Sequence, residues 1–131
     1  MSFQVDVERD QDSIAGIISL DLNNLKIMND TQGHQAGDRA LSIVSSCVKK
    51  NLIRGCKFYR VGGDEFEILC FKNGTNKINS MVTNIRHDIE KSTYSCAIGV
   101  AIAEKGEKFS DMMARADALM YEDKLKIKSK K

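Results

Sequence analysis

Residues Lys57–Phe71 have the sequence KFYRVGGDEFEILCF, which predicts two strands joined by a turn. A basic strand, Lys57–Val61, precedes the turn, and an apolar strand, Glu67–Phe71, follows it. We expect Gly62 and Gly63 to supply the positive φ angles of a tight hairpin. Glycine also has no side chain, so a ligand could approach the backbone closely at this turn.

Two carboxylates, Asp64 and Glu65, follow the glycines at the expected tip of the hairpin. Carboxylate oxygens suit a hard cation such as Mg²⁺, together with the phosphates of a substrate. The alternative is an ordinary surface turn, since Gly and Asp are frequent turn residues. The hairpin alone therefore leaves both a ligand site and a plain turn open.

The composition of the whole chain narrows the class of protein. Its 131 residues suit one domain with a sizeable core, and no segment resembles a linker. The formal net charge of +2 is too small to favour non-specific binding to nucleic acid or membranes. No apolar run reaches the length of a membrane span, and the acidic N-terminus is unlike a signal peptide. We expect a soluble, cytoplasmic domain that contacts neither nucleic acid nor membrane.

The cysteines lie far apart in the sequence among apolar residues, without a C-x-x-C pair. They are Cys47, Cys56, Cys70 and Cys96. This spacing predicts small buried thiols in a reducing compartment rather than a zinc site or a disulfide framework. His34 and His87 are likewise too isolated to predict a zinc site.

Hydrophobic periodicity outside the hairpin predicts further strands and helices. The run Ile14–Leu20 is almost continuously apolar, as in a strand covered on both faces, and it ends at Asp21. A polar loop, Asn29–Gly37, follows it. The remaining predicted elements are the helices Asp38–Lys50, Lys77–Glu90 and Phe109–Ile127 and the strand Tyr94–Ala103. The order β-α-β-β-α-β-α predicts an α+β fold with a ferredoxin-like antiparallel sheet flanked by helices.

This topology brings distant carboxylates together. The first strand lies antiparallel to the third, so Asp21 should adjoin Asp64 and Glu65. Two aspartates fit Mg²⁺, which proteins usually hold with one or two carboxylates. Glu65 ranks below Asp64, because neighbouring strand residues point to opposite faces. The alternative for Asp21 is a solvated residue at a strand end.

A longer pattern begins at Asp21. Residues Asp21–Asp38 resemble the D-x-x-x-x-K-x-x-N-D-x-x-G-H-x-x-G-D signature of the GGDEF family of diguanylate cyclases, and Gly62–Phe66 matches the motif that names the family. Ser95–Ala101 and Ala116–Lys124 are similar to two later motifs of that family. The resemblance runs from about Ile14 to Lys128 and implies a nucleotidyl-cyclase palm-type fold.

The resemblance implies roles for residues at the matching positions. Asp21 and Asp64 hold Mg²⁺, or Mn²⁺, with the backbone carbonyl of Leu22. Asn29 and Asp38 recognise guanine, and the alternative for Asp38 is helix capping. The implied catalytic residues are Asp64, Glu65 and Lys26, and the implied substrate-binding residues are Asn29, Asp38, Gly62, Gly63, Lys124, Lys128 and His34.

The implied reaction condenses two GTP molecules into cyclic di-GMP with release of pyrophosphate. Two domains of a homodimer face each other, and Glu65 assists deprotonation of the attacking hydroxyl. A fused sensor or regulatory domain is expected in the full protein. Two alternatives stay open: a degenerate GTP-binding regulatory module, and a related nucleotidyl cyclase with another product. An RNA-binding domain is disfavoured, because the strands lack the aromatic pairs that stack bases.

The chain also departs from the family pattern. Ile53–Cys56 stands where the family has its R-x-x-D product-inhibition motif, so we expect no feedback inhibition there. Met1–Ser13 lacks the family's leader helix, D-x-L-T-x-L-x-N-R, so we expect the single domain 1–131 to be an excised piece or a minimal variant. Lys128 replaces a usual Arg and loses its bidentate geometry. Lys124 and Lys128 share a helix face, with solvated lysines of a basic tail as the alternative.

Overall fold

The protein folds around a four-stranded antiparallel sheet in this computed structural model, which describes residues 2–129 and the side chains up to Ile127. The elements are α1 (Phe3–Asp10), a 3-10 turn η1 (Gln11–Ser13), β1 (Ile14–Leu22), α2 (Leu25–Gln32), α3 (His34–Asn51), β2 (Cys56–Arg60), β3 (Glu65–Phe71), α4 (Thr75–Lys91), β4 (Cys96–Ile102) and α5 (Phe109–Ser129). The strand order is β2-β3-β1-β4, which confirms the predicted ferredoxin-like α+β topology. Among the described helices, none combines the length and the apolarity that crossing a membrane requires.

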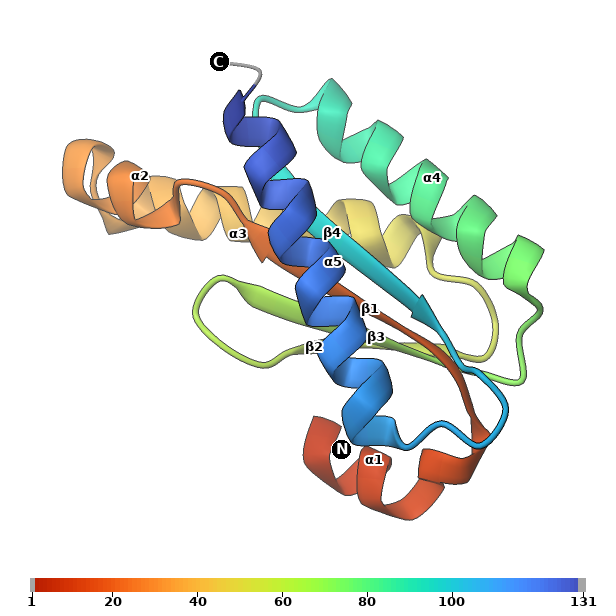
Figure 1. The fold of residues 1–131 in the computed structure, drawn as a ribbon. Helices are drawn as coiled ribbons and strands as arrows, with labels where there is room; N and C mark the ends of the chain where they lie inside the picture. The colour runs from red at the N-terminus through yellow and green to blue at the C-terminus, as the bar shows by residue number, and fades with distance from the viewer. Residues whose placement is uncertain (1, 130–131) are drawn as a thin grey trace.

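The helices cover the two faces of the sheet differently (Figure 1). On the α3–α4 face, Ile18, Leu20 and Leu22 of β1 belong to the larger apolar cluster, which includes residues of both helices. On the α5 face, Ile17 packs with Ala116 of α5 in a second, smaller cluster. β1 therefore lies in the centre of the molecule and is buried on both faces, as its apolar run predicted.

The register of β1 against β3 sets the position of the acidic residues. The two strands pair antiparallel from Ile14 opposite Phe71 to Asp21 opposite Glu65. Because directly opposed residues point to the same face of a sheet, Asp21 and Glu65 share the α5 face. The end of β1 and the start of β3 thus meet at one edge of the fold, as the topology predicted.

Two helices occur where the sequence predicted none. The expected polar loop Asn29–Gly37 is partly helical, since α2 ends at Gln32 and α3 already begins at His34. α2 is short and has no fully buried residue, so it gives a weaker apolar pattern than the longer helices. Gly33, with φ of 88°, separates α2 from α3.

The segment before β1 forms the short helix α1, although it lacks the leader motif. Ser2 caps this helix by accepting a hydrogen bond from the Val5 amide at 3.3 Å. Asp6 anchors the helix to the sheet, because its buried carboxylate accepts a hydrogen bond of 2.5 Å from the Tyr59 hydroxyl. This tertiary contact, rather than a sequence motif, explains a helix that the sequence did not predict.

Candidate active site

The loop between β2 and β3 is wider than the tight turn that the glycines predicted. β2 ends at Arg60 and β3 begins at Glu65, and neither Gly62 nor Gly63 has a positive φ angle. The prediction of positive φ angles at this pair is therefore wrong. The amides of Val61 and Gly62 both donate to the Glu65 carbonyl, at 3.0 and 3.4 Å. The Arg60 guanidinium braces the loop by donating to the carbonyls of Gly62 and Gly63, at 3.2 and 2.7 Å.

The two glycines leave space beside the loop backbone. A Cβ added at Gly63 would meet no atom within 4 Å, and one at Gly62 would meet only the Glu65 side chain, at 3.5 Å. Glycine here exposes the backbone instead of bending it. A ligand can thus approach the loop closely, which was the second part of the prediction.

Asp21 and Asp64 converge, as the fold order predicted. The Leu22 amide donates a hydrogen bond of 2.9 Å to the Asp64 carbonyl and so ties the loop to the end of β1. Burial raises the pKa of Asp21, the Lys124 ammonium opposes this rise, and the nearby Asp64 carboxylate adds to it. Asp21 Oδ2 accepts a hydrogen bond of 3.1 Å from Lys124, whereas its buried Oδ1 has no partner among the described residues. Asp21 is therefore buried and is not the solvated strand-end residue of the alternative.

Glu65 adjoins Asp21 across the sheet, as the fold order predicted. It is the direct cross-strand partner of Asp21, so its exposed side chain shares the α5 face with that residue. Asp64 precedes the strand, so strand alternation does not fix the direction of its side chain. The Asp64 carboxylate is among the groups that raise the pKa of Asp21, so the ranking of Asp64 above Glu65 stays a prediction.

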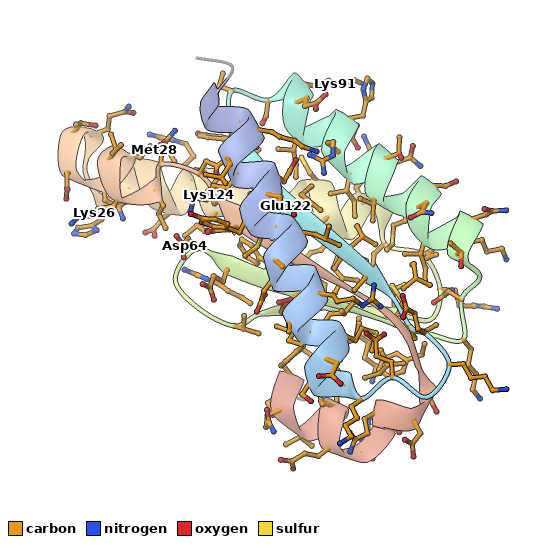
Figure 2. All side chains as sticks on the ribbon, viewed as in Figure 1. Lys26, Met28, Asp64, Lys91, Glu122 and Lys124 are labelled. Carbon is orange, nitrogen blue, oxygen red and sulfur yellow. The ribbon has the colours of Figure 1, made fainter. Side chains whose placement is uncertain are left out.

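A hollow of about 240 Å³ joins the acidic loop to two basic side chains. Its lining includes Leu22, Lys26, Asp64 and Lys124, from the end of β1, α2, the β2–β3 loop and α5. We call this the α2–α5 hollow. Figure 2 shows Lys26, Asp64 and Lys124 gathered at the end of the sheet where α2 and α5 approach each other. One carboxylate, that of Asp64, and the ammonium groups of Lys26 and Lys124 thus line one opening, an arrangement that suits a metal ion and phosphate groups together.

The predicted base-recognition residues meet where α2 and α3 pack. A Cβ on Gly37 would collide with Asn29 Oδ1, so the glycine makes room for the Asn29 side chain against α3. Asp38, exposed, is the next residue of α3. Asn29 Oδ1 is buried and has no hydrogen-bond partner among the described residues, although a buried amide oxygen normally has one. Asn29 therefore packs against the turn of α3 that contains Asp38, and its Oδ1 is an acceptor that a ligand could satisfy.

Two further predicted site residues receive less support from the structure. His34 is exposed at the first turn of α3 and lies outside the lining of the α2–α5 hollow. The Lys128 side chain lies outside the described residues, so its predicted role stays a prediction. Lys26 is exposed on α2 and lines the hollow, and its role at the phosphates stays a prediction.

The family described as diguanylate cyclase, GGDEF domain, matches residues 2–130 of the chain. The chain belongs to the GGDEF family. A similar solved structure is that of the diguanylate cyclase SiaD in complex with its activator SiaC from Pseudomonas aeruginosa. It is 25% identical, with a TM-score of 0.80 over 94% of this chain and 52% of that one. The GGDEF fold is thereby confirmed.

The curated relatives of this GGDEF domain include a protein named as a diguanylate cyclase and one named as a cyclic di-GMP phosphodiesterase. The diguanylate cyclase VdcA of Vibrio cholerae is 27% identical over 120 residues, which are 82% of this chain and 35% of that protein. The cyclic di-GMP phosphodiesterase PdeR of Escherichia coli is 31% identical over 115 residues, which are 81% of this chain and 17% of that protein. The chain thus spans only a minor part of either relative's length.

Other residues position this GGDEF domain's site but escaped the sequence analysis. Asp123 Oδ2 accepts hydrogen bonds from the Ile98 amide at 2.8 Å and from Arg86 at 3.0 Å. It thereby fixes α5 on β4 one residue before Lys124. Asn23 Nδ2 donates to the Ser95 hydroxyl at 2.8 Å and so links the end of β1 to the segment before β4. The signal for Asp123 was its place within the Ala116–Lys124 motif, but its partners are distant in sequence.

A buried carboxylate, Glu67, lies on the α5 face two residues beyond Glu65. Only 3% of Glu67 is exposed, and the Ser19 hydroxyl of β1 lies 2.7 and 2.9 Å from its two carboxylate oxygens. Burial raises the pKa of Glu67 to about 8 despite the opposing hydrogen bond from Ser19. The signal in the sequence was a lone acid within the apolar part of the second hairpin strand.

The oxygen atoms of this GGDEF domain fit a hard cation only if oxygens of a bound ligand, such as substrate phosphates, complete its coordination. Within the described part of the chain, no group of three His, Cys, Asp or Glu side chains is arranged to hold a metal ion. The available oxygens are those of two carboxylates, Asp21 and Asp64, with the Leu22 carbonyl beside them. Magnesium is usually held by one or two carboxylates and substrate phosphates, so this set fits Mg²⁺ better than a protein-only cage. The unpaired Asp21 Oδ1 provides one free ligand atom.

Proposed function

We propose that this GGDEF domain is a diguanylate cyclase, which joins two GTP molecules into cyclic di-GMP and releases pyrophosphate. One observation carries the proposal: Asp64 approaches Asp21 beside Lys26 and Lys124, at the α2–α5 hollow. Phosphoryl transfer needs little covalent chemistry from a protein, since positioning and charge stabilisation provide most of the catalysis. This group of side chains is suited to both tasks.

Asp21, Asp64 and the Leu22 carbonyl are the groups that would hold Mg²⁺ or Mn²⁺. A bound metal ion would neutralise phosphate charge and lower the pKa of the attacking hydroxyl. Without nucleotide, the Lys124 ammonium supplies positive charge to Asp21 at 3.1 Å. Lys124 and Lys26 are the described side chains that would bind the triphosphate, since both line the hollow.

Asn29 and Asp38 would bind the guanine base. A carboxylate accepts hydrogen bonds from guanine N1–H and from its exocyclic amine, whereas adenine presents a lone pair at N1. A bound base would cover the Asp38 carboxylate, and leaving it unpaired against ATP would then favour GTP. The unpartnered Oδ1 of Asn29 supports a ligand at this position.

The reaction needs two domains, because each nucleotide provides both a nucleophile and an electrophile. The 3′ oxygen of one GTP attacks the α-phosphorus of the other, the bond to the pyrophosphate oxygen breaks, and pyrophosphate leaves. Glu65 would accept the 3′ proton, and its exposed position opposite Asp21 supports this role. We therefore propose a homodimer in the catalytic step, with signals from other domains of the full protein controlling its assembly.

A second candidate function is a GTP-binding regulatory module without catalysis. The ion pair between Lys124 and Asp21 favours it, because a lysine that stayed on Asp21 would compete with a metal ion. Turnover separates the two functions, since a regulatory module would bind GTP without consuming it.

The test is product analysis by mass spectrometry of the full chain with Mg²⁺ and a mixture of GTP and ATP, at concentrations that permit dimers. We expect cyclic di-GMP as the main product, no product from Asp64→Ala, and normal product from Glu122→Ala, which removes an exposed carboxylate of α5 (Figure 2). Binding of GTP without product would favour the regulatory module. A mixed or adenine-containing product would contradict the assignment of Asn29 and Asp38.

A further inference from the structure

Cys56 and Cys70 lie directly opposite each other on β2 and β3, at the end of the hairpin remote from the Asp64 loop. The Phe71 amide donates to the Gly55 carbonyl at 2.8 Å, and this bond joins the residues just outside the pair. The two cysteines are therefore a non-hydrogen-bonded pair of the ladder, the type in which Cα atoms approach to about 4.5 Å. Disulfides form between Cα atoms about 4.4 to 6.8 Å apart.

The two thiols also contact each other. Directly opposed side chains share a face, and both cysteines belong to the apolar cluster of the α3–α4 face. Each thiol is the first cause of the other's shifted pKa, and the Cys56 thiol donates a hydrogen bond of 3.4 Å to Asn73 Oδ1. No large backbone movement is needed to bring the sulfur atoms together.

The surroundings make Cys56 the more reactive of the two thiols. Interaction with Cys70 lowers the pKa of Cys56, whereas interaction with Cys56, together with burial, raises the pKa of Cys70. Cys56 is 9% exposed at the margin of the sheet, whereas Cys70 is fully buried. The half-buried Asn73 and the exposed Gly55 lie next to Cys56. Few protein atoms therefore separate the Cys56 thiol from a small reagent in solvent. A thiolate with access to the reagent is the group that oxidants attack.

We propose that Cys56 and Cys70 form an oxidative modification site, in which a hydroperoxide converts the two thiols into a disulfide across β2 and β3. The Cys56 sulfur attacks the terminal peroxide oxygen, the O–O bond breaks, and water or an alcohol leaves. The resulting sulfenic acid is attacked by the Cys70 sulfur, the S–O bond breaks, and the departing hydroxide takes the Cys70 proton as water. Two electrons pass from the thiols to the hydroperoxide. The site is independent of the proposed cyclase activity.

The other cysteines provide an internal comparison. Cys47 lies on α3 and Cys96 on β4, and neither has another cysteine as its strand partner. Burial raises the pKa of both thiols, to about 12 for Cys96. Oxidation should therefore spare these two thiols while the pair reacts.

The experiment treats the full chain with a small molar excess of hydrogen peroxide, then blocks free thiols in denaturant and digests with trypsin. Cleavage at Arg54, Lys57 and Arg60 separates the two cysteines into different peptides. We expect a peptide pair joined through Cys56 and Cys70, loss of two of the four titratable thiols, and reversal by dithiothreitol. Cys47→Ser should leave this product unchanged, whereas Cys56→Ser should abolish it.

Three results would overturn the proposal. One is retention of all four thiols after treatment. Another is oxidation at Cys47 ahead of the pair. The third is a set of disulfides linking different molecules in place of the Cys56–Cys70 bond. Each is read from peptide masses, so failure of the cyclase proposal would not affect the outcome.

Discussion

On one face of β1, Ile18, Leu20 and Leu22 pack into the apolar cluster of α3 and α4, whereas on the other face Ser19 and Asp21 lie on the side of α5. The same strand therefore carries only apolar side chains on one face and increasingly polar ones on the other. Burying a polar group costs stability unless the group is paired. The α5 face has this cost at Asp21, where burial and a second carboxylate raise the pKa.

This difference separates the part of the fold that stabilises the domain from the part that is available for chemistry. The α3–α4 face holds the larger apolar cluster. The α5 face holds a smaller cluster and fixes its helix through the polar contacts of Asp123. Substitutions on the two faces should therefore have opposite effects on stability and activity.

The largest effect on stability is expected from Ile68→Ala on the α3–α4 face. Ile68 is fully buried in the larger cluster, so its truncation should lower the free energy of unfolding by about 3 kcal/mol. Turnover per folded molecule should remain unchanged. Urea unfolding and active-site-normalised turnover check this, with Ile43→Ala, an exposed residue of α3, as the matched control. Loss of turnover in fully folded protein would contradict the proposed division between a stabilising α3–α4 face and a chemically active α5 face.

The next effect concerns Glu67, which is buried on the α5 face. Its pKa is raised in the folded protein, so the fold favours the protonated acid and loses stability as pH rises from about 4.5 toward about 8. The loss is at most about 1.4 kcal/mol per pH unit. Glu67→Gln should remove this slope and be the more stable protein at the alkaline end. Unfolding across this range tests it, with Glu122→Gln as control; an unchanged slope would assign the titration to another group.

The sequence was sufficient for features that depend on element order. The convergence of Asp21 with Asp64 followed from the antiparallel pairing of the first and third strands. The sequence was insufficient where the outcome depends on strand limits or tertiary contacts. The loop between β2 and β3 is wider than a two-residue turn, and β3 begins only at Glu65, so strand alternation does not fix the direction of the Asp64 side chain. α2 carries no buried stripe, and the thiol pair became visible only through the strand register.

Lys124→Met tests whether the ammonium group of Lys124 at the α2–α5 hollow contacts the phosphates of GTP. Loss of a charged hydrogen bond to phosphate, worth about 1.5 to 3 kcal/mol, should raise the KM for GTP roughly tenfold or more. Lys91→Met is the matched control, because Lys91 is an exposed lysine of α4 that lies away from the hollow (Figure 2). Steady-state kinetics of both variants provide the test. An equal effect of the two substitutions would indicate a general charge effect and not a phosphate contact.

Gly37→Ala should have the smallest effect of this series. The added Cβ would collide with Asn29 Oδ1 and displace the Asn29 side chain. Loss of one base contact, worth about 1 kcal/mol, should raise the KM for GTP several-fold with little change in kcat. Gly74→Ala is the control, since a Cβ there meets no atom within 4 Å. If the Gly37→Ala variant kept the wild-type KM, Asn29 would have no part in base recognition.

The division between the two faces is tested most directly by Asp21→Asn, with turnover and thermal unfolding measured on the same sample. The account predicts a roughly thousandfold loss of cyclic di-GMP formation. The unfolding midpoint should stay the same or rise, because burial disfavours the charged form of Asp21. Retention of most of the turnover would contradict the account. So would a fall in the midpoint large enough for unfolding alone to explain the lost activity.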